Sequence, residues 1–521
     1  MESAAAVRDE VEASPRVPDP AAPVALRDTI AAVALGRSEA VQAAAFDRFV
    51  AAADPLSVLA EWFGPHLRTQ CERGGEALRI RLDRDIAALD TLLAEQLDLV
   101  LQDPDLQALE SAWRGLSQLL SAAQDDERVK IRFLSASWDE LCRDFEKASE
   151  FDQSRLFEKI YSEEFGMAGG EPFGLILCDY AVQHRRSSGR PGSRADDISG
   201  LTALSAVGAA AFAPCVVAAH PRLLGVESFE ELSYVQDLGS FLKGEDYSRW
   251  RKFQERPESR FLGIVLPRVL MRAPWSDDGS RRDRFRFGDG CAGLRSGDWL
   301  WGSAVYAFGA VVVRAFRENG WFADIRGTRT DSEEAGLITR LPQTPFSTRE
   351  AIAYRPPVEV ALTDRKQRAF EELGFITVCP CPMTPDLTFL GTQSAYSEAH
   401  LGSLAYEANS RLSAMLHYVL CVSRFAHYVK VIARDRVGSQ STAEQLQSML
   451  NDWVRQYVTS PTASNEAKRR QPLSDASVEI TDVVGRPGVF GCVMHIQPHF
   501  QIDQVVAGFR LYTEIEGLRI S

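Results

Sequence analysis

The stretch 154–180, SRLFEKIYSEEFGMAGGEPFGLILCDY, joins a helical pattern to an apolar run through a Gly-Gly-Glu-Pro turn. Apolar residues recur near helical spacing between residues 156 and 165, and glycines then interrupt the pattern between residues 166 and 170. Residues 173–178 form a short apolar run of strand length. A helix that leads into a covered strand predicts a layered core.

The order of these elements argues against a phosphate site at the glycines. Glycines that cradle phosphate normally follow a strand and open the next helix, so that backbone N–H groups point at the anion. Here the helix precedes the glycines and the strand follows them. We interpret the stretch as a packing turn that needs the backbone freedom of Gly169 and Gly170, with a nucleotide-binding loop as the alternative.

Composition and charge exclude several classes of partner. The chain has 521 residues, 45% hydrophobic and 25% charged, which is ordinary for two or three globular domains. The net charge of −14 and pI near 5.2 argue against general affinity for nucleic acid or anionic lipid. Nine cysteines are scattered along the chain, and its first residues lack the basic-then-apolar layout of a secretory signal. We therefore expect free thiols and a cytoplasmic location.

Two uncharged runs, residues 198–219 and 299–313, are candidate membrane spans. The first contains Pro214, which predicts a helix that ends before the proline and a strand at residues 215–219. The second is shorter than the roughly 20 residues that a span needs. We interpret both runs as buried core.

The chain before residue 150 is predicted to be mainly helical. Residues 1–25 are rich in Ala, Pro and acidic residues without apolar periodicity, which predicts a disordered tail. A loose apolar stripe predicts a helical segment at 26–75. Further predicted elements are helices at 76–102 and 104–120, paired as a hairpin with Asp103 as N-cap, a strand at 128–134 and a helix at 138–148.

The remaining chain alternates helices with strands, which predicts mixed α/β layers, a large domain at 76–394 and a second domain at 395–521. The predicted helices are 299–316, 364–373, 412–433 and 442–458. The predicted strands are 261–266, 358–362, 375–378, 478–484, 489–496 and 505–515. The predicted polar loops are 183–197, 276–298, 327–350 and 459–476.

The usual enzyme signatures are missing: the chain has no GxxxxGK[ST], HExxH, GxSxG or paired CxxC. Cys379 and Cys381 are too closely spaced for common zinc pairs, so a chance position at a strand end is favoured over a metal site. His495 and His499 lack an evident third ligand, and His427 lies on an apolar helix. We interpret all three histidines as structural.

Two further groups of residues are candidate sites, one for a nucleotide and one for acid/base catalysis. Gly288, Gly290 and Gly293 spell a GxGxxG without a preceding apolar strand, which favours a flexible loop. Glu163, Glu164 and Glu171 could act as paired carboxylates in acid/base catalysis, but only a turn separates them, and a solvated or capping role is favoured. We assign no catalytic, cofactor-binding or metal-binding residue, and expect a non-enzymatic protein.

Several blocks together resemble the TssC/VipB family, the large subunit of the contractile sheath of type VI secretion. They run in the same order as in that family over residues 76–513. The blocks are LESAWRGL (109–116), LFEKIYSEEFG with GGEPFG and CDY (156–180), RFAHYVKVIARDRVGS (424–439), LNDWVRQYV (450–458), and PLSDASVEITDVVGRPGVF with IQPHFQID (472–503).

The resemblance implies a contractile-sheath-subunit fold with a helical N-terminal segment and C-terminal helices plus strands. It also implies a structural subunit that pairs with a small TssB/VipA-like subunit, stacks with other copies around the inner tube protein Hcp on a baseplate, and contracts to eject the tube. The terminal strands at 478–515 match a segment that adds to neighbouring subunits' sheets. A ClpV-type AAA+ ATPase binds an N-terminal helix in the family, and the matching position is 26–50.

The chain departs from the family in three places: a longer tail with additional residues at 54–75, the loop at 325–342, and residues 183–197. A divergent sheath-related adaptor is therefore an alternative to a working sheath subunit. A soluble α/β hydrolase or nucleotide enzyme that uses the region of Glu163, Glu164 and Glu171 is the alternative from another class.

Overall fold

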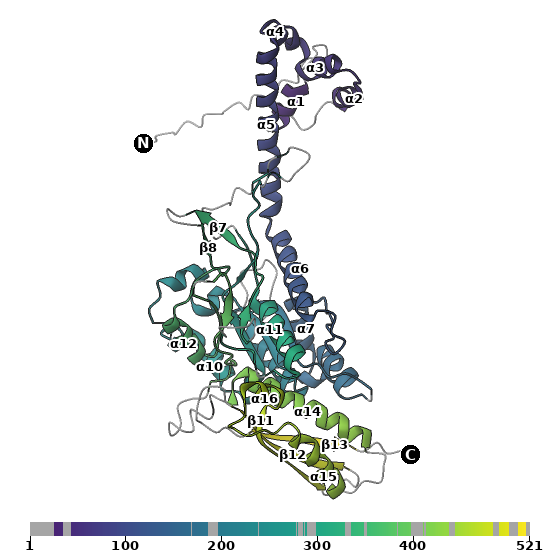
Figure 1. Cartoon of the computed structure of the whole chain (residues 1–521), viewed down its shortest axis with the longest axis vertical. Coiled ribbons are helices and arrows are strands. Elements are labelled where there is room, and N and C mark those ends of the chain that lie inside the picture. Colours follow the sequence, from purple (N-terminus) through teal and green to yellow (C-terminus); the bar gives the residue numbers. More distant parts are fainter. Residues whose placement is uncertain are drawn as a thin grey trace, which may run out of the picture. The chain divides into compact units, whose positions relative to one another are not determined.

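The structure is a computed structural model, and its elements are drawn in Figure 1. It describes residues 26–34, 43–167, 169–185, 196–237, 239–277, 279, 285, 287–288, 299–322, 324–328, 335–347, 352–382, 384–397, 410, 413–436, 443–482, 489–499 and 509–516. The predicted tail at 1–25 lies outside these residues.

The chain forms two compact units. One comprises Met1–Asp103 and Trp275–Ala292, and the other comprises Pro104–Pro274 and Gly293–Ser521. The boundary at residues 394 and 395 therefore stays a prediction. The helical hairpin at Asp103 also stays a prediction, because its two helices belong to different units.

The first unit is helical. Trp62 and Phe63 are buried in its small apolar core, and the Trp62 indole N–H donates to Asp85 Oδ2 at 3.1 Å. This bond fixes α3 on the long helix that carries Asp85. The helices are α1 (Leu26–Ala34), α2 (Ala43–Ala51), α3 (Pro55–Phe63), α4 (Leu67–Glu72) and α5 (Gly75–Leu101), as the apolar stripes predicted.

The second unit is built on a six-stranded sheet of order β1-β2-β3-β9-β10-β6. The first four strands are parallel and the last two pairings are antiparallel. The strands are β1 (Ile176–Val182), β2 (Cys215–Ala219), β3 (Leu262–Leu266), β9 (Ile376–Pro380), β10 (Leu387–Phe389) and β6 (Leu337–Ile338). The mixed α/β class predicted from the alternation of elements is confirmed.

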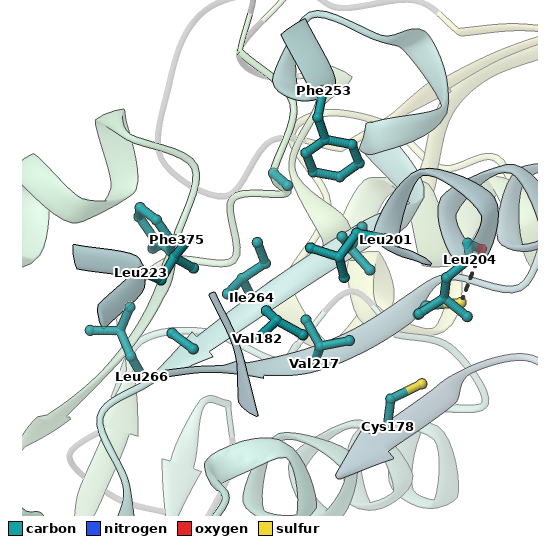
Figure 2. Close-up of a cluster of buried hydrophobic side chains, with 14 of the residues drawn as sticks. Cys178, Val182, Leu201, Leu204, Val217, Leu223, Phe253, Ile264, Leu266 and Phe375 are labelled. Carbon is teal, nitrogen blue, oxygen red and sulfur yellow. Dashed lines mark hydrogen bonds between the residues drawn. The ribbon is translucent and has the colours of Figure 1, made fainter. Parts of the chain in front are cut away.

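Apolar side chains alternate between the two faces of this sheet, as the pleat requires. In β2, Cys215 and Val217 enter one core cluster, whereas Val216 enters the cluster on the opposite face. Figure 2 shows the first cluster, in which Val217 of β2 and Ile264 of β3 lie beside Leu201 of the helix Asp197–Ala210. Both faces are covered, which is why the strands read as continuous apolar runs.

Helices cover both faces. Those that contribute to the cluster of Figure 2 are α7 (Trp138–Lys147), α9 (Asp197–Ala210), α10 (Ser248–Gln254) and α12 (Asp364–Glu372). Those that contribute to the opposite cluster are α6 (Pro104–Ala123) and α11 (Ala304–Asn319), joined by the start of α14 (Leu416–Arg436).

The stretch 154–180 has the predicted order of helix, glycine turn and strand. Helix α8 (Arg155–Phe157) continues as a π-helix over Glu158–Phe165, and β1 begins at Ile176. Gly169 has φ = 81°, a conformation that favours glycine. The turn packs closely on the helix, because a Cβ added at Gly170 would lie 2.1 Å from the Glu164 carbonyl oxygen.

The C-terminal part of this unit is a three-stranded antiparallel sheet of order β11-β12-β13. Helices α14 and α15 pack on it and bury its apolar residues. Its elements are α15 (Ala443–Arg455), α16 (Asn465–Arg470), β11 (Leu473–Asp482), β12 (Val489–Pro498) and β13 (Phe509–Glu516). The remaining strands form two separate antiparallel pairs. These are β4 (Val269–Arg272) with β5 (Leu300–Gly302), and β7 (Thr344–Ser347) with β8 (Ile352–Arg355).

Two predicted strands are wrong. Arg128 lies in a turn, and residues 129–134 have no regular secondary structure and pair with no described strand; ion pairs of Lys130 and Arg132 hold them instead. Residues 358–362 have three buried apolar side chains, yet only Val358 forms a bridge, with Val269. The apolar pattern corresponds to burial at residues 358–362 but not at Phe133, which is exposed, and a strand also needs a neighbour within hydrogen-bonding reach.

Other boundaries also differ. The helix predicted from residue 299 begins at Ala304, because Ser303 Oγ accepts from the Val305 N–H at 3.2 Å and caps it, and residues 300–302 form β5. The polar loop 327–350 contains β6 and β7, and the linker 459–476 contains α16 and the start of β11.

Both uncharged runs are buried core. The first forms α9 and then β2 on either side of Pro214, as predicted. The second lies in β5 and α11. In the part of the chain that the structure describes, no helix combines the length and apolarity needed to cross a membrane.

Candidate assembly interface

The C-terminal sheet has two edges, and α15 closes the edge at β11. The Val478 N–H donates to Asn451 Oδ1 at 2.9 Å, and Asn451 Nδ2 donates to the Val478 carbonyl at 2.8 Å. The Ile480 N–H donates to Gln447 Oε1 at 2.8 Å. These side-chain amides take the place that the backbone of a neighbouring strand would occupy.

Helical spacing positions the two amides. Gln447 and Asn451 are four residues apart, so they lie on the same side of α15. Asn451 Nδ2 also donates to the Gln447 carbonyl at 3.1 Å, which holds its orientation. Leu446 and Leu450, one position before each amide, are buried in the core beneath the sheet. The apolar contacts anchor the helix, and the amides reach the strand edge.

The chain after α15 closes the beginning of β11. The Leu473 N–H donates to the Tyr457 carbonyl at 3.1 Å, and the Thr459 N–H donates to the Leu473 carbonyl at 2.9 Å. At the opposite edge, β13 pairs with β12 from Phe509 to Glu516. Among the described residues, none pairs with the outer side of β13. The sheet therefore has one closed edge and one edge at which a further strand could add.

An aromatic cluster joins this sheet to the rest of its unit. Phe425 is fully buried in α14, and its ring stacks on Trp321 with centroids 4.3 Å apart. Trp453 and Tyr457 contact the same ring at 5.8 and 5.6 Å. Trp321 directly follows the Gly320 cap of α11. The cluster thus ties α11 to the helices under the C-terminal sheet.

The three carboxylates weighed as an acid/base site do not converge on a pocket. Glu164 Oε2 accepts from the Glu171 N–H at 2.9 Å, and Glu164 also pairs with Arg132. These two interactions, in that order, hold the pKa of Glu164 below its usual value. Glu171 pairs with Lys130, whereas Glu163 is exposed. Glu164 caps the glycine turn, and both paired carboxylates anchor the segment 128–134 through Lys130 and Arg132.

The cysteines and histidines considered as metal ligands belong to no such site in the part of the chain that the structure describes. Burial raises the pKa of Cys379 to about 11 and raises that of Cys381 less. The His499 N–H of the backbone donates to the Pro472 carbonyl at 2.8 Å, which fastens the end of β12, and His495 lies in β12. Within the described residues, no group of three or more His, Cys, Asp or Glu side chains could hold a metal ion. Gly290 and Gly293 of the GxGxxG lie outside those residues.

His427 is a core residue, as predicted from its apolar helix. It is 1% exposed, and its Nε2–H donates to the Ala211 carbonyl at 2.9 Å. Its ring meets Phe165 edge-on with centroids 5.2 Å apart. Burial lowers the pKa of His427 to about 4, because the charged form loses hydration that the site does not replace.

We expect His427 to make the chain acid-sensitive. A folded-state pKa of about 4 lies below the usual 6.5, so protonation favours the unfolded state and stability falls as the pH drops through this window. Between pH 7.5 and 5 the loss is about 2 kcal/mol. Urea unfolding of the native chain and of His427→Gln measures it, because Gln keeps an N–H donor but does not titrate. Equal losses in both chains would contradict this assignment.

The amides of α15 were not predicted as functional residues. In the sequence, Gln447 and Asn451 are polar residues beside the apolar stripe of a helix, a pattern that is typical of solvent-exposed positions. Their spacing of four residues next to buried leucines is the signal that could have pointed to a role at the sheet edge. The partner groups, at Val478 and Ile480, lie some thirty residues later in the sequence.

Known proteins resemble this chain over most of its length. The family model VipB (EvpB/VC_A0108, tail sheath N-terminal domain) matches residues 83–396, and VipB_2 (EvpB/VC_A0108, tail sheath gpW/gp25-like domain) matches residues 405–515. The "Type VI secretion system sheath protein TssC1" of Pseudomonas aeruginosa is 34% identical over 439 residues, covering 83% of this chain and 86% of that protein.

Among solved structures, a sheath tail protein from Desulfitobacterium hafniense matches 63% of this chain and 62% of its own at 10% identity, with a TM-score of 0.29. That likeness is too weak to support an argument. The two family models and the TssC1 relative, which together span nearly all of residues 83–515, show that this chain belongs to the TssC/VipB family of type VI secretion sheath proteins.

Proposed function

We propose that the chain is a structural subunit of a contractile sheath, in which it pairs with a small TssB/VipA-like subunit and with other copies of itself. Membership of the sheath family supports this directly. The observation that carries the proposal is the asymmetry of the C-terminal sheet, closed at β11 by Asn451 and Gln447 and open at β13. When one copy donates a strand to this edge of the next copy, the contact is head-to-tail, and such contacts build an open helix where their rotation does not close a ring.

The sheath surrounds an inner Hcp tube in the cytoplasm, is anchored on a baseplate and ejects the tube on contraction. The work comes from rigid-body rearrangement of subunits between two packings, so interface residues and linkers matter rather than an active site. The two well-packed core clusters of the central sheet support movement of this unit as a rigid body.

Recycling of the contracted sheath by a ClpV-type ATPase is a further part of the proposal. The matching region, 26–50, includes α1 and α2. Both helices are amphipathic and short, which suits capture of a helix by a partner groove. Deletion of residues 1–50 is the test: sheath should still assemble, while binding of the ATPase to contracted sheath should be lost.

Co-expression with the cognate small subunit, followed by negative-stain electron microscopy, tests the proposed function. We expect tubes or sheath fragments that contain both proteins. The native chain expressed alone is the control for tubes that form without the small subunit. Soluble, monodisperse chain that neither retains the small subunit nor forms tubes would overturn the proposal.

A further inference from the structure

Helix α14 makes different contacts on its two sides. On one side, Phe425 and Val429 are buried in the core beneath the C-terminal sheet. Steps of about 100° per residue place His427, Lys430 and Arg434 on the opposite side. These three side chains contact the end of α9 or the chain that runs from the π-helix into the glycine turn. Helix α14 therefore separates the C-terminal sheet from that part of the unit.

Lys430 contacts the π-helix through its charged end. Its Nζ lies 3.8 Å from the centroid of the Phe165 ring and 4.7 Å from that of Tyr161, and it donates to the Tyr161 hydroxyl at 3.2 Å. Phe165 is buried and Tyr161 is partly buried, so the ammonium contacts two aromatic rings where water is partly excluded. A cation–π contact is stronger in such a place than at an exposed site. One turn further along α14, the Arg434 guanidinium donates to the Met167 carbonyl.

Two unusual backbone conformations meet at this contact. The π-helix Glu158–Phe165 ends where the Gly166 N–H donates to the Tyr161 carbonyl, five residues back, at 2.6 Å. Phe212, just after α9, has φ = 49°, which is unfavourable for a residue with a Cβ. Its ring meets that of Phe165 edge-on, with centroids 6.1 Å apart. Such conformations persist where surrounding contacts hold them and are concentrated at functional sites. The contacts with α14 are among those that hold the π-helix.

The π-helix leads directly into the central sheet. It continues through the glycine turn into β1, the first strand of that sheet. The contact of Lys430 with the π-helix thus connects the two sheets of this unit by a short path, through α14 and the glycine turn. This path is separate from the aromatic cluster of Trp321 and Phe425, which connects the C-terminal sheet to α11.

We propose that the contact of Lys430 and Arg434 with the π-helix is a mechanical coupling, which makes the central sheet follow the C-terminal sheet when a neighbouring subunit pulls on it. This rests on the proposed function, in which neighbours join at the C-terminal sheet. The π-helix brings two aromatic rings and the Met167 carbonyl to one side, and α14 meets them with two cations. The coupling therefore depends on charge, whereas the apolar packing on the other side of α14 does not.

Hydrogen exchange in the full-length chain, without the small subunit, tests the coupling. Lys430→Met keeps most of the apolar stem but lacks the ammonium. Its β12 amides should exchange about tenfold faster than in the native chain, while those of β2 and β3 change by less than about threefold, because the C-terminal sheet then opens separately. Lys430→Arg, which keeps the charge, should retain most of the protection. Lys159→Met, which removes an exposed lysine of the same π-helix, should exchange as the native chain does.

Two exchange results would overturn the proposal. Equal loss of protection in β12, β2 and β3 would show that Lys430 only stabilises the whole unit. Unchanged protection in Lys430→Met would show that its ammonium does not connect the sheets. If Lys430→Met does not fold, Tyr161→Phe replaces it, because this substitution removes only the hydroxyl that accepts from Lys430. Its β12 amides should then exchange about threefold faster, again without a matching change in β2 and β3.

Tubes formed with the small subunit separate this proposal from the proposed function. Lys430→Met should still form tubes, because the β13 edge is unchanged, but the same brief sonication should break them to about half the length of native tubes. Lys159→Met tubes should match native tubes. If the native chain forms no tubes, the proposed function is wrong, and the exchange comparison still decides whether Lys430 connects the sheets. If Lys430→Met tubes keep the native length, the contact does not carry the pull and the coupling is wrong.

Discussion

Replacing Gly170 by alanine is expected to lower the free energy of unfolding by about 3 kcal/mol and to reduce the yield of assembled tubes with it. A Cβ at this position would lie 2.1 Å from the Glu164 carbonyl oxygen, 2.8 Å from its carbonyl carbon and 2.9 Å from its Cα. All three are backbone atoms of the π-helical turn, which cannot move aside as the end of a side chain can. The glycine turn must therefore separate from the helix.

Gly174→Ala is the matched control, because a Cβ there would meet only Phe322 Cζ, at 3.9 Å. We expect its stability to stay within about 0.5 kcal/mol of the native chain. Urea unfolding of the two variants measures the difference, and negative-stain counts of tubes measure assembly. Similar stability and tube yield in both would show that the close approach at Gly170 is unimportant.

The same turn also anchors the segment 128–134. Glu164 accepts from the Glu171 N–H just beyond the glycines, and Glu164 also pairs with Arg132 of the segment 128–134. A displaced turn therefore moves both carboxylates that hold this segment.

Local patterns were enough to predict most helices. The helix predicted at 138–148 forms as α7 because Ser137 and Glu140 cap it reciprocally, and those residues are only three positions apart in sequence. Gly320 and Gly374, both with positive φ, follow α11 and α12 near the predicted ends. Strand pairing is not local, which is why the alternating residues 128–134 were wrongly predicted as a strand.

The candidate interface was predicted only in part. The terminal strands could be located, because apolar and polar residues alternate in most of β11 and β12 begins as an apolar run. The sequence does not reveal which edge of the sheet is closed, because the pairing of Asn451 with Val478 depends on how α15 lies on the sheet. Burial of His427 followed from its apolar neighbours, but its partner, the Ala211 carbonyl, is more than two hundred residues away.

The second large effect is expected for Asn451→Ala. The substitution leaves the N–H and the carbonyl of Val478 without their partner, and Val478 is only 1% exposed. Each unpaired buried backbone group costs about 1–3 kcal/mol, so the variant should lose about 3 kcal/mol in all. Asp452→Ala, at an exposed position one residue further along α15, should change stability by less than about 0.5 kcal/mol.

Loss of the amide should also change how the chain associates. With Asn451 gone, the β11 edge offers free backbone groups to other chains, as an unprotected edge strand does. Light scattering at increasing concentration should then show self-association of Asn451→Ala that Asp452→Ala lacks, and tubes with the small subunit should be irregular, because strands can add at both edges of the sheet. Because a general loss of stability would raise aggregation only near the unfolding transition, association that already occurs well below it identifies the opened edge as the cause. A destabilised variant that stays monodisperse under these conditions would show that the bulk of α15, rather than its amides, keeps the edge closed.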